Sequence, residues 1–135
     1  MASFAFIDGR LEVNSVVLST FCRAINLNTN ADELDDTAMG DTYRSRIGGL
    51  KDWSVGPEFN SDFAASAVDV TLFPLLGTTT TVKVRATSAA ISATNPEYSG
   101  SVLVSQYNPF SNSVGDLATV SVQWPGAGTL TRATA

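Results

Sequence analysis

The 135-residue sequence contains no histidine and a single cysteine. Without histidine the chain cannot build a Ser-His-Asp or Cys-His catalytic arrangement, nor a zinc site with histidine ligands. Cys22 cannot form an internal disulfide. It also has no histidine base to activate it, so we interpret it as a small, buried apolar residue rather than a nucleophile.

Long apolar runs are missing as well. The longest candidates are interrupted by Asp69, Pro74 or Gly77, whereas a membrane-spanning helix needs about 20 apolar residues. The first ten residues, "MASFAFIDGR", have neither the cationic start nor the continuous apolar stretch of a secretory signal. We therefore expect synthesis in the cytoplasm and no association with a membrane.

Positive charge is scarce: 8 basic residues stand against 13 acidic ones, a net charge of −5. This balance argues against a surface that grips the phosphates of nucleic acid. The acidic run "DELDD" lacks the glycine and the closing glutamate of a calcium-binding EF-hand, and "RIGGLKD" lacks the spacing of a phosphate-binding loop. A carboxylate pair for glycoside hydrolysis is not excluded, but a chain this short offers little scaffold for a substrate cleft. We expect no cofactor, no metal and no enzymatic activity.

The composition is typical of one soluble globular domain over residues 1–135, since 44% of the residues are hydrophobic and 16% are charged. Alternating apolar and polar residues predict a mainly β fold. Asp8-Gly9, between runs containing Phe4, Phe6 and Leu11, indicates a tight hairpin turn.

Further strands are predicted along most of the chain. One spans about residues 23–30, after a possible single helical turn. Another buries one face of residues 53–59, where Pro57 indicates an edge strand or a bulge. Three more follow within residues 78–88, 100–110 and 115–126. The C-terminal residues form either an edge strand or a flexible tail.

One short helix is predicted after the strand of residues 53–59. Asp62 is a suitable N-cap, and Phe63, Ala67 and Val70 recur near helical spacing. Pro74 and Gly77 should end this helix.

Residues 31–45 carry four clustered acids and a fifth nearby, and they read as a long loop or arm between strands. Such a segment is either functional or simply a solvated loop that keeps the protein soluble. The clustered acids are Asp32, Glu33, Asp35 and Asp36, and the fifth is Asp41.

The stretch "LDDTAMGDTYRSRIGGLKDWSVGPEFNSDF", residues 34–63, resembles the tail tube proteins of long-tailed bacteriophages. In that family an acidic "L-D-x-T-x-x-G-D-T" segment precedes a "G-L-K-D-W" strand start. The resemblance implies a β-sandwich or barrel-like tail tube domain with one short flanking α-helix and a long loop or arm.

The resemblance also implies a function. Six copies would form a ring, and stacked rings would form the tube through which viral DNA leaves the capsid. The implied partners are the protein itself and the tape measure, tail terminator and tail-tip proteins, with DNA passing through the lumen without specific binding. The implied location is the tail of the virion, after synthesis in the cytoplasm of the host bacterium.

By position, the resemblance assigns two groups of residues. An intersubunit arm would comprise Leu34, Asp35, Asp36, Thr37, Met39, Gly40, Asp41, Thr42, Arg44 and Arg46. A turn from the arm into the sheet would comprise Gly48, Gly49, Leu50, Lys51, Asp52 and Trp53. Trp53 itself is better explained as a core aromatic than as a contact residue. Arg44, Arg46 and Lys51 are expected to pair with the arm's acids across subunits, which would set register more than stability.

Two other functions stay open at this stage. The chain could be a phage head decoration or head-tail connector subunit. Alternatively it could be a monomeric carbohydrate-binding module, for which the candidate aromatic residues are Tyr43, Tyr98, Tyr107 and Trp124.

Overall fold

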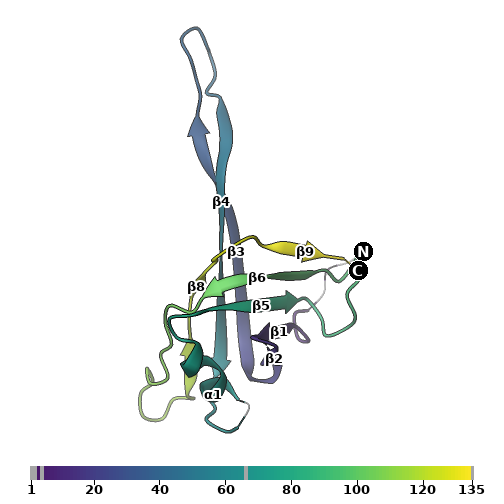
Figure 1. The fold of residues 1–135 in the computed structure, drawn as a ribbon, viewed down its shortest axis with the longest axis vertical. Coiled ribbons are helices and arrows are strands. Elements are labelled where there is room, and N and C mark those ends of the chain that lie inside the picture. The colour runs from purple at the N-terminus through teal and green to yellow at the C-terminus, as the bar shows by residue number, and fades with distance from the viewer. Residues whose placement is uncertain (1–2, 4, 66, 135) are drawn as a thin grey trace.

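Two antiparallel sheets form the framework of the protein in a computed structural model, which describes residues 3, 5–65 and 67–134 (Figure 1). The larger sheet has the order β2-β1-β5-β6-β9, with bounds Val16–Val17, Arg10–Val13, Thr79–Arg85, Glu97–Leu103 and Thr131–Ala133. The other contains β3 (Cys22–Asp35), β4 (Arg46–Asn60), β7 (Thr119–Ser121) and β8 (Trp124–Pro125). The predicted mainly β fold is confirmed, and the described strands form two open sheets rather than a closed barrel.

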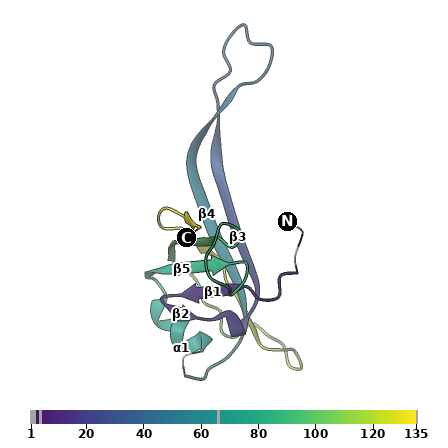
Figure 2. The same ribbon diagram turned by 90° about the vertical axis from the view of Figure 1, so that its right-hand side faces the viewer.

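The core lies between these sheets and draws on both. Leu11, Val82 and Val102 come from the larger sheet, while Phe59 and Trp124 come from the other, and all five are buried. Their alternation with polar neighbours follows from the two-residue period of a strand, which sends successive side chains to opposite faces. Figure 2 shows β1 and β5 running across the long β3–β4 hairpin.

The first hairpin turns at Asn14-Ser15 and not at Asp8-Gly9 as predicted. Asn14 and Ser15 have φ angles of 51° and 65°, so both central residues adopt the left-handed conformation that a two-residue hairpin requires. β1 then pairs with β2 through Val13 and Val16. Asp8 instead accepts a 2.7 Å hydrogen bond from the hydroxyl of Ser88. Phe4 lies outside the described residues.

Pro57 sits in an interior strand and pairs in register with Ile25, so it marks neither the predicted edge strand nor the predicted bulge. β4 pairs with β3 along one side, and with β7 and β8 along the other. The pairs with β8 end at Val55 and those with β7 start at Glu58, so Pro57 occupies the gap between them. Its carbonyl accepts from Val122 N–H at 3.3 Å, and its nitrogen faces the same side. The missing N–H therefore costs no ladder hydrogen bond.

The helix is shorter than predicted and begins later. α1 spans Val68–Leu72 with Ala67 as its N-cap, and a 3₁₀ turn, η2 (Phe73–Leu75), follows it. The side chain of Asp62 does not cap α1, because its Oδ1 accepts from Ala64 N–H at 2.9 Å and closes a local turn, but its backbone carbonyl accepts from Asp69 N–H at 3.2 Å. Gly77, with φ +83°, ends this region as predicted.

The remaining predictions agree with the structure in some segments and differ from it in others. The single helical turn before the second strand region is present as η1 (Ser19–Phe21), and the strand after Thr78 is β5. β6 begins at Glu97, earlier than predicted, and ends at Leu103. β9 pairs with β6, so the C-terminal residues form an edge strand and not a tail.

Candidate functional site

A two-stranded arm, residues 31–51, projects from the body as the far half of the β3–β4 hairpin (Figure 1). The loop predicted over residues 31–45 is therefore mostly strand, and only residues 36–45 form the tip loop. Every residue from Asn28 to Gly48 is exposed. The arm thus has no core of its own, and an isolated two-stranded hairpin is only marginally stable in water.

Cross-strand pairing defines the register of the arm. Glu33 pairs with Gly48 and Leu34 with Ile47, while Gly49 and Leu50 of β4 lie opposite the single residue Asp32 of β3 and form a bulge. A bulge of this kind increases the local twist of a hairpin and interrupts its outer edge. It is the main irregularity in an otherwise continuous ladder.

The turn predicted at Gly48–Trp53 is wrong, because these residues lie inside β4. Neither Gly48 nor Gly49 has a positive φ. A Cβ at Gly48 would meet open space, whereas one at Gly49 would lie 3.0 Å from the Cβ of Asp32. Gly49 is thus explained by its close approach to Asp32 across the bulge. Leu50, Lys51 and Asp52 continue the strand toward the body.

Asp35 organises one side of the tip loop. Its Oδ1 accepts from Thr37 N–H at 2.9 Å, and its Oδ2 accepts from Arg44 at 2.8 Å. Hydrogen bonds from Thr37, with a smaller contribution from Arg44, hold the pKa of the Asp35 carboxyl below its ordinary value of 3.8. Arg44 therefore has a partner within its own chain.

A second set of hydrogen bonds closes the loop. Asp41 Oδ2 accepts from Ala38 N–H at 2.8 Å, and Gly40 between them has φ +94°. The hydroxyl of Thr37 accepts from Ser45 N–H at 2.8 Å. The motif residues Asp35, Thr37, Gly40 and Asp41 thus shape the tip through local hydrogen bonding.

Other side chains of the arm are exposed and take no part in the hydrogen bonds that shape the tip loop. Met39 and Tyr43 at the tip are almost fully exposed, at 103% and 86%, and Leu50 is 81% exposed. Arg46 and Lys51 have no ion-pair partner among the residues that the structure describes. Asp36 bonds Ser45 through its backbone, and the side chain of Thr42 is exposed. Apolar groups presented this way are typical of an interaction surface.

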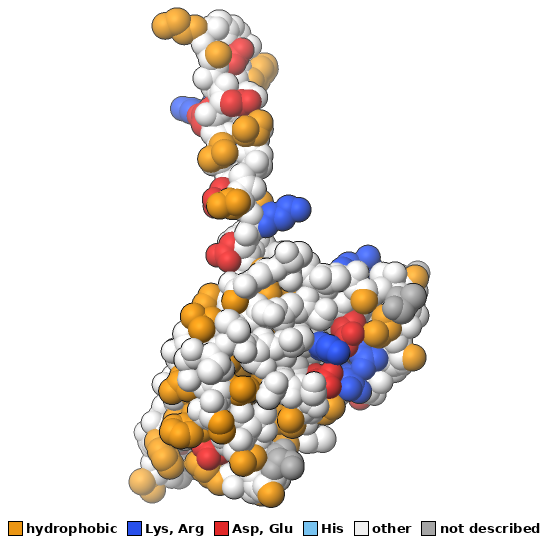
Figure 3. Space-filling model, viewed as in Figure 1, with side chains coloured by type: hydrophobic (Ala, Val, Ile, Leu, Met, Phe, Trp, Pro, Cys, Tyr) orange, Lys and Arg blue, Asp and Glu red, His pale blue; other side chains and the backbone are white. Residues whose placement is uncertain are grey.

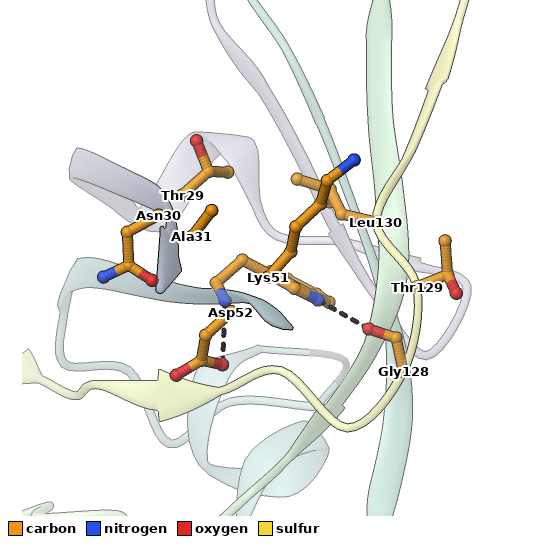
Figure 4. Close-up of a pocket in the computed structure, with 9 residues that line it drawn as sticks. Thr29, Asn30, Ala31, Lys51, Asp52, Gly128, Thr129 and Leu130 are labelled. Carbon is orange, nitrogen blue, oxygen red and sulfur yellow. Dashed lines mark hydrogen bonds between the residues drawn. The ribbon is translucent and has the colours of Figure 1, made fainter. Parts of the chain in front are cut away.

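Trp53 anchors the arm to the body, which confirms its assignment to the core. It is 8% exposed, and its indole N–H donates to the carbonyl of Gly128 at 2.8 Å. The ring lies against Gly100 and Gly126, where any side chain would overlap it. Beside it is a hollow of about 500 Å³, drawn in Figure 4, whose lining includes Lys51 and Leu130. The glycine contacts were missed because nothing in the sequence links residues so far apart.

A second exposed surface lies at the other end of the body. We call it the apolar end; it consists of Phe63, Val70, Phe73, Phe110, Val114 and Leu117. The rings of Phe63 and Phe110 stack with centroids 5.8 Å apart. Hydrophobic side chains gather at the lower end of the space-filling view (Figure 3).

The sequence placed Phe63 and Val70 with Ala67 on the apolar spacing of a helix. In the structure Ala67, Val68 and Leu72 are buried, whereas Phe63 and Val70 are 56% and 51% exposed. Ala67 is therefore buried as predicted, whereas Phe63 and Val70 lie outside the core because α1 starts later than predicted.

The positions of the candidate residues argue against sugar binding and thiol chemistry. Trp124 is fully buried and Tyr43 lies on the arm, so the four candidate aromatics do not share one sugar-binding face. Burial raises the pKa of the Cys22 thiol, which disfavours the nucleophilic thiolate. Within the described part of the chain, no cluster of three potential metal ligands was found. No described helix has the length and apolarity to cross a bilayer.

The geometry thus defines a two-sheet β protein with a projecting hairpin arm, and the same architecture occurs in solved structures. A chain in the virion of a native gene transfer agent particle superposes with a TM-score of 0.75 at 16% identity, covering 93% of this chain and 95% of that chain. A chain in the tail of an empty gene transfer agent particle, computed with C6 helical symmetry, gives a TM-score of 0.67 at 18% identity, covering 85% and 83%. No family model matches the sequence, and no curated protein matches it significantly. The fold agrees with the resemblance to tail tube proteins.

Proposed function

We propose that this protein is a virion structural subunit that assembles into sixfold rings, which stack into the tail tube of a phage-like particle. One observation carries the proposal: nearly the whole chain shares its fold with a virion chain, and most of it with a chain of a C6-symmetric tail. The sequence motif of residues 34–63 points to the same class independently of the fold.

The arm is the proposed intersubunit contact. It carries ten of the residues that the family resemblance assigned, and the exposure of residues 28–48 supports an ordering role for a neighbouring copy. Gly48, Gly49, Leu50, Lys51, Asp52 and Trp53 form the root of this arm as a continuous strand in this proposal.

The proposed tail tube also implies the role of the domain, its location and its further partners. Residues 1–135 act as one domain whose task is assembly rather than catalysis, located in the virion tail. Tape measure, tail terminator and tail-tip proteins are the further proposed partners. A net charge of −5 suits a conduit wall that does not retain DNA.

Electron microscopy of the purified protein over a range of concentrations tests the proposal. We expect sixfold rings and, at higher concentration, tubes. A protein that stays monomeric in sedimentation at every concentration, also with tail-tip proteins added, would contradict it. Immunogold labelling of intact particles separates a tail location from a head decoration or connector.

Removing the arm tests its role within that function. Asn30 pairs with Asp52, so an Asn-Gly turn joining these two residues keeps the register of the hairpin below the cut. We expect the truncated body to stay folded, because the removed residues lie outside the core, and to form no tubes. Circular dichroism checks folding. Tubes of normal length from the truncated protein would exclude the arm as the contact.

A further inference from the structure

Each of the two sheets has an outer face that points away from the core. The sheets pack on each other through the core, so their outer faces point in opposite directions. In β4, buried residues from Trp53 to Phe59 alternate with half-buried ones, which therefore lie on the outer face of the smaller sheet. Cross-strand pairs with β3 and β7 extend this face across the sheet, because directly opposite residues share a face.

Uncharged polar side chains cover most of the outer face of the smaller sheet. We call this surface the amide face; its characteristic residues are Asn26, Asn28, Asn30, Ser54, Ser121 and Gln123. Apart from the half-buried Ser54, these six are exposed. Gln123 donates to the hydroxyl of Ser54 at 2.8 Å and lies over Gly56, where a Cβ would be 2.5 Å from its Oε1. Gly56 therefore leaves room for the amide of Gln123 on this face.

Few charges occur on the amide face. Glu58 lies on it, and an Nη1 of Arg23 lies 3.8 Å from the Glu58 carboxylate. Asp52 pairs with Asn30 where the arm begins. Among the described residues of this face, Arg23 is the one base, and it has an acidic partner. The face is therefore neutral to slightly acidic.

The outer face of the larger sheet is charged instead. Arg10 of β1 lies directly opposite Arg85 of β5, and Glu97 of β6 lies on the other side of Arg85. Glu12 and Lys83 form the next pair on the same face. The ion pairs are loose, at 3.9 Å for Arg10–Glu12 and 3.8 Å for Arg85–Glu97. Three bases thus share this face with two acids.

We propose that the amide face lines the lumen of the tube and that duplex DNA moves past it, while the charged face of the larger sheet points outward. This inference rests on the proposed function and names the wall of the conduit. Lysine and arginine hold phosphates by releasing counterions, and the effect grows with each contact. Amide and hydroxyl groups carry no net charge, so a wall made of them does not hold a passing duplex. Because every copy repeats the wall, one unpaired base would recur along the whole tube.

Cysteine labelling of assembled tubes tests which face lines the lumen. In a Cys22→Ser background, one variant carries Asn28→Cys on the amide face and another carries Thr81→Cys on the outer face of β5, both at exposed positions. Each is treated with N-ethylmaleimide or with a maleimide coupled to a carrier protein much wider than a DNA duplex. In tubes, we expect Asn28→Cys to react with the small reagent only and Thr81→Cys to react with both. The unassembled variants should react with both reagents.

Three labelling results overturn the proposal. Carrier attachment to Asn28→Cys in tubes would place the amide face outside, and no reaction with either reagent would place it between copies. Protection of Thr81→Cys from the carrier would mean that the charged face does not point outward. Each result is obtained on tubes, so the tail tube function would stand. Ser121→Cys, also exposed on the amide face, replaces Asn28→Cys if that variant fails to assemble, and a wild-type protein without tubes contradicts function and inference together.

Added charge tests why the amide face lacks bases. Tubes with Asn26→Lys and Asn28→Lys should retain a short DNA duplex in a nuclease-resistant form. Retention should fall about tenfold or more between about 50 and 200 mM salt. The matched pair Thr79→Lys and Thr81→Lys places the same charge on the exposed face of β5, where nuclease should digest any retained DNA. Digestion of the DNA held by the first variant, or retention no greater than in wild-type tubes, would contradict the proposal.

Discussion

At the scale of single residues, Trp53 connects the arm to the body through contacts that depend on glycine. Its ring covers Gly100 and Gly126, and its indole N–H reaches the carbonyl of Gly128. A Cβ at Gly100 would lie 2.7 Å from the ring. The glycines are therefore required here by close approach rather than by an unusual φ.

Replacing Gly126 with alanine should destabilise the protein by about 1–3 kcal/mol, because the new methyl group overlaps the Trp53 ring. The matched control is Gly128→Ala, where a Cβ meets open space and the accepting carbonyl is kept; its effect should stay within about 0.5 kcal/mol. Urea unfolding followed by tryptophan fluorescence measures both. Equal effects at the two positions would contradict this account.

Asp35 makes the tip loop sensitive to acid. Its pKa is lowered in the folded state, chiefly by Thr37, so its contribution to the order of the loop is complete above about pH 3.8. That contribution is lost as the pH falls through the lower, folded pKa. We expect Thr37→Ala to raise the pKa of Asp35 more than Arg44→Gln does. A carboxyl NMR titration of the three proteins checks the order, and the reverse order would contradict it.

At the scale of elements, one part of the β3–β4 hairpin packs on the core and the other part projects as the exposed arm. Near the body, Val55 and Phe59 bury one face of β4 in the core. Toward the tip the same strand has no sheet beneath it, and both faces are exposed. Apolar side chains such as Leu34, Ile47 and Leu50 are therefore left exposed along the arm.

The adjacent glycines Gly48 and Gly49 should respond differently to valine. Gly48→Val places a β-branched side chain in open space on a strand, so the amide protons of the arm should exchange as slowly as before, or more slowly. Gly49→Val crowds Asp32 at the bulge and should speed exchange. Hydrogen exchange followed by NMR distinguishes them. A large loss of protection in Gly48→Val would restore the turn hypothesis.

At the scale of the whole molecule, the fold has an axis, with a projecting arm at one end and exposed aromatic rings at the other. A monomer gains nothing from either surface, because both leave apolar groups in water. An assembly that covered both surfaces would remove this apolar area from water.

Substituting both Phe110 and Val114 with serine should abolish tube growth while the protein stays folded. Both side chains are largely exposed, and the loss of the Phe63–Phe110 stack should cost about 0.5–1.5 kcal/mol. Ile7→Ser, at an equally exposed apolar residue away from either end, is the control and should assemble normally. Microscopy and thermal unfolding measure assembly and folding. Tubes from the double variant would contradict an assembly role for the apolar end.

Local patterns sufficed for much of the fold. Alternation predicted that Trp53, Val55 and Phe59 share one buried face, and the threonine and valine content predicted β5. Both could be predicted because the two-residue period of a strand is visible in neighbouring residues of the sequence. The motif around residues 34–63 likewise identified the arm before its shape was known. The prediction was wrong where two segments could each form a turn: the hairpin turn lies at Asn14-Ser15 and not at Asp8-Gly9.

By itself, the sequence determined the β class, the anionic balance and the absence of histidine chemistry, since these depend only on which residues are present and how they alternate. Tertiary structure alone decided that residues 31–35 and 46–51 pair into a projecting arm, and that Gly49 lies in its bulge. It also decided that Phe63 and Phe110 meet at the opposite end. The physical reason is that pairing and side-chain contact join residues distant in the chain, and their free energy depends on the whole fold.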